Sequence, residues 1–278
     1  MTGTLYLLPT VIADDTLDVA IPPGVAERAR HIRRFYVEAA KTARAYLKAL
    51  EHPVAIAELS IEEIGHDPDP EKLDAWLQPV MGGEDAAVVS ESGCPGIADP
   101  GAQLVARAHE LGIRVVPLTG PSSLLMTLMA SGLDGQRFRF SGYLPIHETE
   151  RAEAIRSLEA ASRRSETQLF IETPYRNQAM LETLLATLAP DTRLTVAADI
   201  TGAGESIRTR RVADWKAALG KEPPLAKVPT VFALLAASRG AAPRYAPEDA
   251  RHKGERRRTP HPARRTAGGS RSTLKNRR

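Results

Sequence analysis

Residues 86–132 decide the fold, and they read AAVVSESGCPGIADPGAQLVARAHELGIRVVPLTGPSSLLMTLMASG. Two short apolar runs in this stretch, 86–90 and 114–118, have the length and β-branched content of buried parallel strands. A loop rich in glycine, proline and serine follows each run, and a helical pattern follows each loop. Open α/β sheets bind their ligands at the carboxyl ends of their strands. We therefore expect two ligand-binding loops that project from the ends of adjacent strands.

The helices that follow these loops have recognisable ends. Asp99 is the expected N-cap of the first helix, with Pro100 at its first position. Gly112 is the expected left-handed residue after the end of that helix. The second helix is expected to begin at Ser122 or Ser123, where free amide groups and hydroxyls suit a carboxylate or a polar adenine edge.

The remaining sequence continues the alternation of strands and helices. In the first half we expect strands at 4–8 and 34–38, helices at 39–50 and 72–81, and connections at 22–24 and 64–69. In the second half we expect strands at 137–142, 168–172, 194–199, 206–212 and 228–235, and helices at 149–162, 177–188 and 213–219. Because strands follow one another near the end, the second sheet is predicted to be mixed. The pattern predicts α/β domains over residues 1–133 and 134–238.

Composition excludes several classes of protein. The chain has 278 residues, 42% of them hydrophobic, and no apolar run approaches a membrane span. Cys94 is the single cysteine, which excludes an internal disulfide and fits a reducing cytoplasm. The start of the chain lacks the pattern of a signal peptide, so we expect a cytoplasmic protein. The sequence contains no zinc-type spacing, no GxGxxG after a first strand and no Walker A motif, so neither a structural metal nor a nicotinamide or nucleotide-hydrolysing enzyme is expected.

The net charge of +3 conceals an uneven distribution. Residues 239–278 hold 13 Lys and Arg against 3 Asp and Glu, whereas the rest of the chain holds 24 against 31. The last segment also lacks hydrophobic periodicity, and we expect a disordered basic tail. Such a tail either binds nucleic-acid phosphates electrostatically or remains a solvated segment without a specific partner.

Several motifs resemble one known family in content and order. They are GTLYLLPT at 3–10, SESGCPGIADPG at 90–101, TGPSS at 119–123, SGL at 131–133, FRFSGYLP at 138–145 and ETPYR at 172–176. Together they resemble the tetrapyrrole-methylase-like family of S-adenosylmethionine (SAM) methyltransferases, nearest to the branch that methylates a ribose 2′-hydroxyl of small-subunit ribosomal RNA. The chain departs from that branch at 11–15, at 38–41, where EAAK replaces Glu-Asp-Thr-Arg, and at 198–202, where ADITG replaces Arg-Glu-Leu-Thr-Lys.

The resemblance implies a fold, a cofactor and a set of contacts. It implies two α/β domains of the tetrapyrrole-methylase type, SAM in the cleft between them, and a homodimer. The implied cofactor-binding residues are Pro9, Glu91, Ser92, Gly93, Cys94, Ser122 and Ser123. No histidine or acid neighbours Cys94 in sequence as a nucleophile's partner would. In the family that the chain resembles, the corresponding position belongs to the cofactor loop, so the resemblance implies packing or cofactor contact for Cys94.

The acceptor site is predicted from charge spacing together with the partial match to the ribosomal branch. Glu38, Lys41 and Arg44 are three residues apart, and at the start of a helix residues with this spacing share one face. Resemblance suggests that this helix lines the interdomain cleft, whereas an exposed charge stripe is the simpler alternative. Arg176, just after Pro174, is either a phosphate contact or an ordinary surface residue at a helix start. A general base is not identified.

The sequence thus predicts a SAM-dependent methyltransferase. RNA is the leading acceptor, most of all a ribose hydroxyl of ribosomal RNA, and the basic tail favours it. The acidic remainder of the chain leaves two alternatives open. One is methylation of a small tetrapyrrole-like metabolite, and the other is a nucleic-acid-binding protein that retains the fold without turnover.

Overall fold

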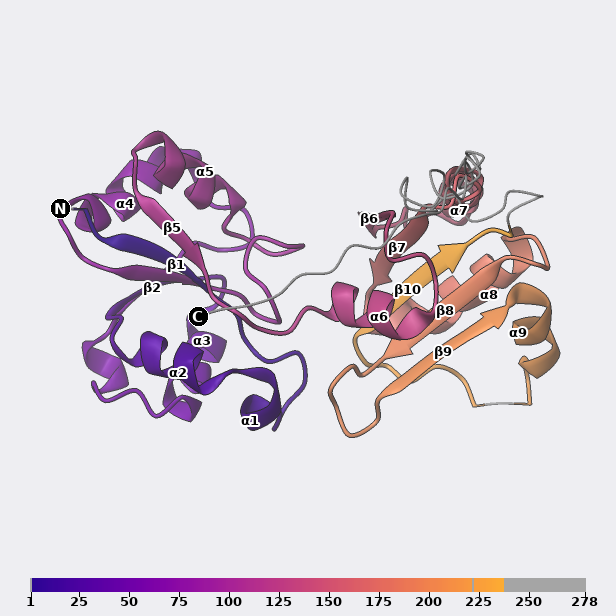
Figure 1. Ribbon diagram of the computed structural model, residues 1–278, viewed down its shortest axis with the longest axis horizontal. Coiled ribbons are helices and arrows are strands. Elements are labelled where there is room, and N and C mark those ends of the chain that lie inside the picture. Colours follow the sequence, from indigo (N-terminus) through magenta and orange to yellow (C-terminus); the bar gives the residue numbers. More distant parts are fainter. Residues whose placement is uncertain (1, 222, 238–278) are drawn as a thin grey trace, which may run out of the picture. The chain divides into compact units, whose positions relative to one another are not determined.

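The structure is a computed structural model that describes residues 2–221 and 223–237. The basic tail predicted for 239–278 lies outside these residues. Residues 4–235 contain two five-stranded sheets, each with its own helices (Figure 1). Within the described part of the chain, no helix is long and apolar enough to cross a membrane.

The first sheet is entirely parallel, in the order β3-β2-β4-β1-β5. Its strands are β1 (Thr4–Leu8), β2 (Arg34–Val37), β3 (Ser60–Glu63), β4 (Ala86–Val89) and β5 (Arg114–Pro117). The expected adjacency of β4 and β5 is wrong, because β1 lies between them and pairs with both. β4 is buried throughout as predicted, but β5 is an edge strand whose two end residues are exposed. β3 was not predicted, because its sequence SIEE is polar and half exposed.

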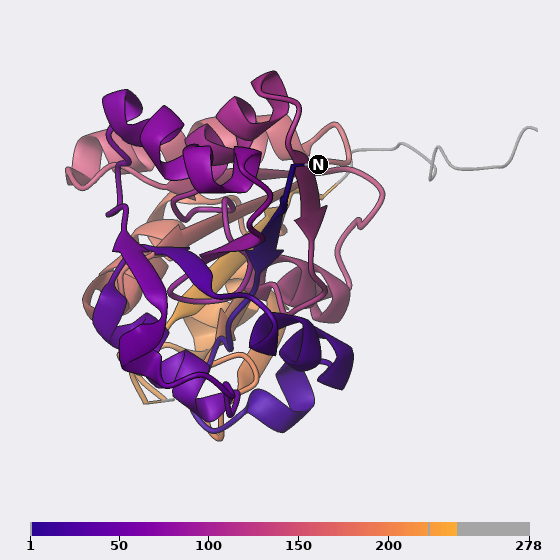
Figure 2. The same ribbon diagram turned by 90° about the vertical axis from the view of Figure 1, so that its left-hand side faces the viewer.

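Helices cover both faces of the first sheet, as Figures 1 and 2 show. One face carries α1 (Leu17–Ala20), α2 (Pro23–Arg30) and α3 (Ala40–Ala49), and the other carries α4 (Leu73–Met81) and α5 (Ala102–Glu110). The 3₁₀ turns η1 (Ile56–Glu58) and η2 (Pro70–Lys72) lie in the connections. Side chains of β1 alternate between the faces, with Tyr6 and Leu8 in one apolar core and Leu5 in the other. This alternation follows from the two-residue period of a strand.

The expected connection at 22–24 is wrong in part, because Pro23 begins α2. Proline at the first helical position has its backbone angle already set, and its missing N–H has no partner to lose there. The Pro-Pro-Gly sequence therefore starts a helix instead of forming a turn.

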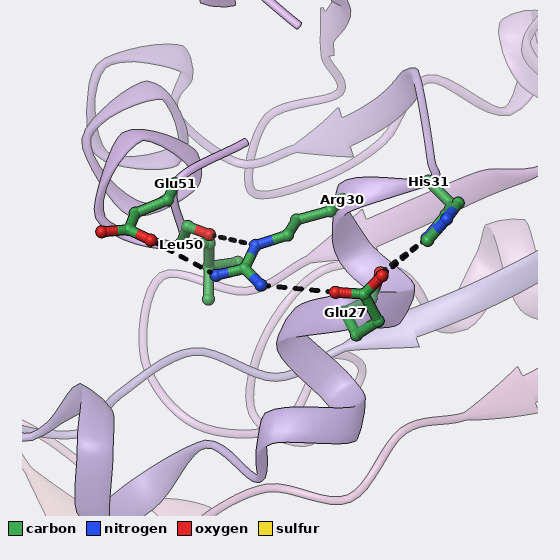
Figure 3. A network of polar contacts seen from close by, with 5 residues as sticks. All are labelled: Glu27, Arg30, His31, Leu50 and Glu51. Atoms are coloured by element: carbon green, nitrogen blue, oxygen red, sulfur yellow. Dashed lines mark hydrogen bonds and ion pairs between the residues drawn. The ribbon is translucent and has the colours of Figure 1, made fainter. Parts of the chain in front are cut away.

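Arg30 at the end of α2 joins this helix to the end of α3 (Figure 3). Its Nε donates a hydrogen bond of 2.8 Å to the backbone carbonyl of Leu50, the C-cap of α3. Its guanidinium also lies 3.3 Å from Glu27 and 3.7 Å from Glu51, and His31 Nδ1 lies 2.8 Å from the Glu27 carbonyl. A positive side chain at a helix C-terminus satisfies a free carbonyl and complements the helix dipole.

The second sheet has the order β6-β7-β10-β8-β9. Its strands are β6 (Phe138–Tyr143), β7 (Thr167–Glu172), β8 (Arg193–Ala198), β9 (Ser206–Arg211) and β10 (Thr230–Leu235). Only the β6–β7 pair is parallel, and the other three pairs are antiparallel. The prediction of a mixed second sheet is therefore confirmed. Its helical elements are α6 (Ser123–Ser131), α7 (Glu148–Ser162), η3 (Pro174–Arg176), α8 (Asn177–Thr187) and α9 (Val212–Ala218).

The helices of the second sheet are divided unequally between its faces. Phe232 and Leu234 of β10 pack in the core formed with α7, α8 and α9. Val231 and Ala233 point to the other face, where Leu128 of α6 packs. α6 was expected to close a first domain at residue 133, yet it packs on the second sheet, so the change of sheets precedes it. The domain boundary itself stays a prediction.

The ends of the two helices that follow the loops were predicted with different success. Ser122 is the N-cap of α6, and Gly112 follows α5 at φ +69°, both as expected. The predicted N-cap Asp99 with Pro100 at the first position is wrong, because α5 begins at Ala102 with Gly101 as N-cap. The Pro100 carbonyl instead accepts a hydrogen bond from the Gly96 amide at 3.2 Å. The chain therefore completes a turn before the helix begins.

Candidate functional site

A cavity of about 270 Å³ is lined by residues from both halves of the described chain. We call its lining from the first half the first wall, which consists of Ile12 and residues 92–94, 97–99 and 122–124. The second wall comes from the second half and consists of Tyr143, 171–172, Pro174, Ile200 and 229–231. The volume is close to the lower end of small-molecule sites, roughly 300 Å³.

A larger hollow of about 620 Å³ lies elsewhere, against α8, α9, β8 and β9. None of the predicted site residues lines it. Among the residues that the structure describes, no buried polar atom without a partner belongs to its lining either. Size alone therefore does not identify the functional cavity, and we examine the smaller one.

The two loops of the first wall meet although β1 separates their strands. Cys94 Sγ lies 3.3 Å from the carbonyl of Pro121, which joins the loop after β4 to the loop after β5. Gly120 packs directly on Pro9 at the end of β1, where a Cβ on the glycine would lie 2.2 Å from Pro9 Cγ. Only glycine allows this contact, so the sequence Gly-Pro before α6 sets the distance between the loops.

The loop after β4 is held in one conformation by its backbone. The Gly93 carbonyl accepts hydrogen bonds from the Thr10 amide at 2.9 Å and from Ser90 Oγ at 2.6 Å. Gly93 itself has φ +73°, a region that side chains disfavour. The loop thus presents its residues to the cavity with little freedom, as a binding site requires.

The structure brings five of the seven predicted cofactor residues to the cavity. These are Ser92, Gly93, Cys94, Ser122 and Ser123.

The other two predicted cofactor residues, Pro9 and Glu91, do not line the cavity. Pro9 is buried behind Gly120, and its carbonyl accepts a hydrogen bond of 2.7 Å from the Tyr46 hydroxyl. Glu91 is exposed and accepts a hydrogen bond from Thr42 of α3. The Pro9 carbonyl and the Glu91 side chain therefore join the loops to α3.

Burial shapes the chemistry of Cys94. Desolvation, and after it the charge of Asp99, raises the pKa of the Cys94 thiol. A raised pKa keeps the sulfur protonated at neutral pH, which makes a poor nucleophile. The expected role of Cys94 in packing or cofactor contact stays a prediction.

The predicted acceptor residues do not line the cavity. Glu38 precedes α3, whose N-cap is Ala39, so the expectation that three charges share one helical face is wrong for Glu38. Its carboxylate lies 3.2 Å from His66 Nδ1. Lys41 and Arg44 are on α3 and exposed, which fits both an acceptor contact and a solvated stripe.

Arg176 is engaged by a buried carboxylate. Its Nη2 and Nε lie 2.6 and 3.0 Å from Glu172 Oε1, which also accepts the Thr173 amide at 2.6 Å. The Glu172 side chain is 1% exposed. An isolated buried charge is costly, so this ion pair is part of what allows an acid at the end of β7. Arg176 has a structural partner that the sequence did not reveal.

Sequence reasoning missed the two carboxyl groups that line the cavity. Asp99 was predicted as a helix cap and as part of a family motif, and Glu172 only as part of a family motif, so neither was predicted as a site residue. Asp99 Oδ2 and Glu172 Oε2 are buried without a hydrogen-bond partner among the described residues. The available signal was an acidic residue that directly ends a buried apolar run, as Glu172 ends TQLFIE.

The environment of Asp99 disfavours its negative charge. Burial is the main reason that its pKa is raised to about 6, and the charge of Glu38 adds to it. A backbone hydrogen bond from Ser92 acts in the opposite direction. Perturbed carboxyl groups in a cavity are characteristic of functional sites.

The lining of the cavity fits SAM. Apolar side chains such as Ile12, Leu124 and Val231 suit an adenine ring. The free oxygens of Asp99 and Glu172 suit hydrogen-bond donors or a positive charge. Within the described residues no group of His, Cys, Asp and Glu side chains could hold a metal ion.

Two solved structures, those of a methyltransferase and of a synthase, share this fold. The methyltransferase CobJ aligns with a TM-score of 0.57 at 18% identity, over 85% of this chain and 95% of that one. Diphthine synthase aligns with a TM-score of 0.56 at 17% identity, over 84% and 90%. At such low identity the likeness concerns the fold alone. The expected two-part α/β architecture is confirmed.

Sequence comparisons give the family. The profile of the Tetrapyrrole (Corrin/Porphyrin) Methylases matches residues 19–215. A protein of Pseudomonas aeruginosa named ribosomal RNA small subunit methyltransferase I is 31% identical over 223 residues, 77% of this chain and 73% of that protein. The protein of that name from Synechocystis is 33% identical over 72% and 67%. The match to that from Escherichia coli O157:H7 is 36% identical but spans about half of each chain, 49% and 47%.

These matches show that the chain is a methyltransferase, and therefore an enzyme. More particularly, it belongs to the tetrapyrrole methylase family, whose members generally use SAM.

Proposed function

We propose that this protein transfers a methyl group from SAM to small-subunit ribosomal RNA, with a ribose 2′-hydroxyl as the acceptor. The observation that carries the SAM assignment is the cavity, which joins two motif loops to two unpartnered carboxyl oxygens. The names of the relatives support RNA as the acceptor. The cofactor residues predicted from sequence belong to the same proposal.

The residues of the chain contribute binding, orientation and exclusion of water. SAM supplies an electrophilic methyl group for an in-line displacement. The amide groups of Ser122 and Ser123 at the start of α6 would donate hydrogen bonds to its carboxylate. The apolar parts of both walls exclude water from the reacting atoms. Because the electrophile comes with SAM, alignment of the acceptor supplies much of the acceleration.

RNA approaches, in this proposal, from the side of α3. Lys41 and Arg44 are exposed cations on that helix and suit backbone phosphates. Glu38 lies near the cavity, because its charge acts on Asp99.

We propose further that the enzyme is a cytoplasmic homodimer, as the family resemblance implies, and sedimentation of the purified protein tests the dimer.

The experiment is a map of ribose methylation in small-subunit ribosomal RNA. RNA from a strain that lacks this protein is compared by mass spectrometry with RNA from the parent strain. The proposal predicts one methylated ribose that disappears and returns when the gene is restored. An unchanged map, together with a metabolite fraction labelled by radioactive SAM, would favour a small-molecule acceptor. An unchanged map without labelling would favour a binding protein.

A further inference from the structure

We infer that Asp99, together with Glu172 from the second wall, makes the cavity select the positively charged methyl donor over its neutral product. The inference rests on the proposed function, because it takes SAM as the ligand. It adds that charge, and not only shape, distinguishes SAM from S-adenosylhomocysteine at this site.

Asp99 offers a hydrogen-bond acceptor that the protein does not use. Its Oδ2 is buried and has no partner among the described residues, although the side chain lines the cavity. Buried polar oxygens in folded proteins are nearly always paired with protein, water or ligand. A ligand in the cavity would therefore complete the pairing of Asp99.

Glu172 offers the second unused acceptor. Its Oε1 accepts all three hydrogen bonds described for this carboxylate, from Arg176 and from the Thr173 amide. Its Oε2 accepts none and the side chain is 1% exposed. Arg176 balances the charge of Glu172 from outside the cavity, so Glu172 is chiefly a fixed, directional acceptor. The uncompensated negative charge at the cavity belongs to Asp99.

The residues around Asp99 do not neutralise its negative charge. The charged groups that act on it are Glu38 and Glu91, which oppose its ionisation, and His66, which favours it. The thiol of Cys94 also lies nearby. No Lys, Arg or His side chain lines the cavity in the described part of the chain. A cation is thus the ligand charge that this environment favours.

The reaction removes that cation. As the methyl group moves from sulfur to the acceptor oxygen, the C–S bond breaks and its electron pair stays on sulfur, which becomes a neutral thioether. The acceptor hydroxyl releases its proton to water. The attraction that Asp99 provides is therefore present for the donor and lost for S-adenosylhomocysteine, which favours release of the product.

The titration of Asp99 adds a pH signature. Its pKa of about 6 means that the charge is largely lost below that pH. SAM should therefore bind more tightly as the pH rises from 5 to 7, whereas S-adenosylhomocysteine should bind almost equally across this range. Glu38, Glu91 and His66 influence the midpoint, so the profile is compared with that of an Asp99→Asn variant.

The test is calorimetric titration of three ligands into the full-length protein. SAM and sinefungin carry a positive charge at the reacting position, and S-adenosylhomocysteine does not. Asp99→Asn should lower the ratio of the dissociation constants of S-adenosylhomocysteine and SAM about tenfold, or about 1.4 kcal/mol. Sinefungin should follow SAM. Glu172→Gln should reduce the ratio less. Glu153→Gln, which removes an exposed charge on α7 that does not line the cavity, should leave it unchanged.

The outcomes separate the inference from the proposed function. If the wild-type protein binds none of the three ligands, both fail. If it binds them and Asp99→Asn leaves the ratio unchanged, the charge selection alone is wrong. If the variant is misfolded by circular dichroism, the wild-type pH profile decides, and equal profiles for SAM and S-adenosylhomocysteine overturn the inference.

Discussion

The two walls of the cavity are built in different ways. Apart from Ile12, the first wall consists of glycine-containing loops that follow parallel strands, and its residues lie close together in sequence, at 92–94, 97–99 and 122–124. The second wall consists of residues from separate places in the chain, which lie in or beside β6, β7 and β10 and in the segment 199–204, such as Tyr143, Ile200 and Thr230. The first wall depends on backbone conformation, and the second on the pairing of distant strands. Substitutions in the two should therefore fail differently.

The largest expected effect on stability is at Gly120, which holds the first wall together. A Cβ there would lie 2.2 and 2.4 Å from two ring carbons of Pro9. Gly120→Ala should lower the free energy of unfolding by about 3 kcal/mol, the upper range for overpacking. Gly24→Ala is the matched control, because the same methyl group meets nothing within 4 Å in α2. Denaturant unfolding measures both, and equal stability of the two variants would exclude the packing role.

The next effect concerns α3, which lies outside both walls. Lys41→Glu and Arg44→Glu should each reduce kcat/KM for RNA about tenfold, or about 1.4 kcal/mol, while SAM affinity is unchanged. Each change puts a negative charge where the proposal expects phosphates. Lys48→Glu, an exposed change later on α3, is the control. Normal methylation by both variants would show that these charges form only a solvated stripe.

Replacement of Asp99 should stabilise the folded protein although it weakens the preference for SAM. Its raised folded-state pKa means that ionisation costs stability above about pH 6, whereas below pH 3.8 the carboxyl is protonated in both states. Asp99→Asn should therefore stabilise the protein at pH 7 and lose this advantage as the pH falls from 6 to 3.8. Because the residue is only half-buried and solvent screens its charge, we expect a gain on the order of 1 kcal/mol. Thermal unfolding at pH 7 and pH 4 tests it, and a loss of stability at pH 7 would contradict the account.

The smallest effect is expected at Arg30, which contacts neither wall. Arg30→Ala removes the hydrogen bond to the Leu50 carbonyl and should cost about 1 kcal/mol of stability. Glu27→Gln leaves that bond in place and removes an exposed ion pair, so about 0.3 kcal/mol is expected. Both variants should bind SAM normally in a titration. Weaker SAM binding by Arg30→Ala would show that this end of the first sheet influences the cavity.

The difference between the two walls also explains how much of the fold and the site the sequence could predict. The sequence predicted β4 and β5 because the glycine-containing loops that follow them, with Gly93 and Gly120, are recognisable from local sequence. The order of the strands was not predicted, since nothing local in 86–132 shows that β1 inserts between β4 and β5. The start of α5 was misplaced because Asp-Pro matches a helix start, while the turn closed by Gly96 and Pro100 is visible only in three dimensions.

The family motifs include only part of the second wall, such as Tyr143 and Glu172. Glu172 ends an apolar strand, but its pairing with Arg176 and its free Oε2 depend on burial that no spacing reveals. The charge spacing of Glu38, Lys41 and Arg44 was weaker evidence, since a helix that begins at Ala40 excludes Glu38 from the shared face. Conformational signals were thus more informative than charge patterns.

The central claim is that the loop containing Gly93 forms the SAM site, and titration of SAM into Gly93→Val tests it most directly. Valine at φ +73° would strain the loop and approach the Pro121 carbonyl, which lies 3.2 Å from the position of a Cβ. Gly112→Val imposes similar strain at φ +69° in open space after α5 and serves as the control. We predict that SAM binds the wild type and Gly112→Val, and that binding to a folded Gly93→Val is undetectable. Equal affinity for all three proteins would contradict the account.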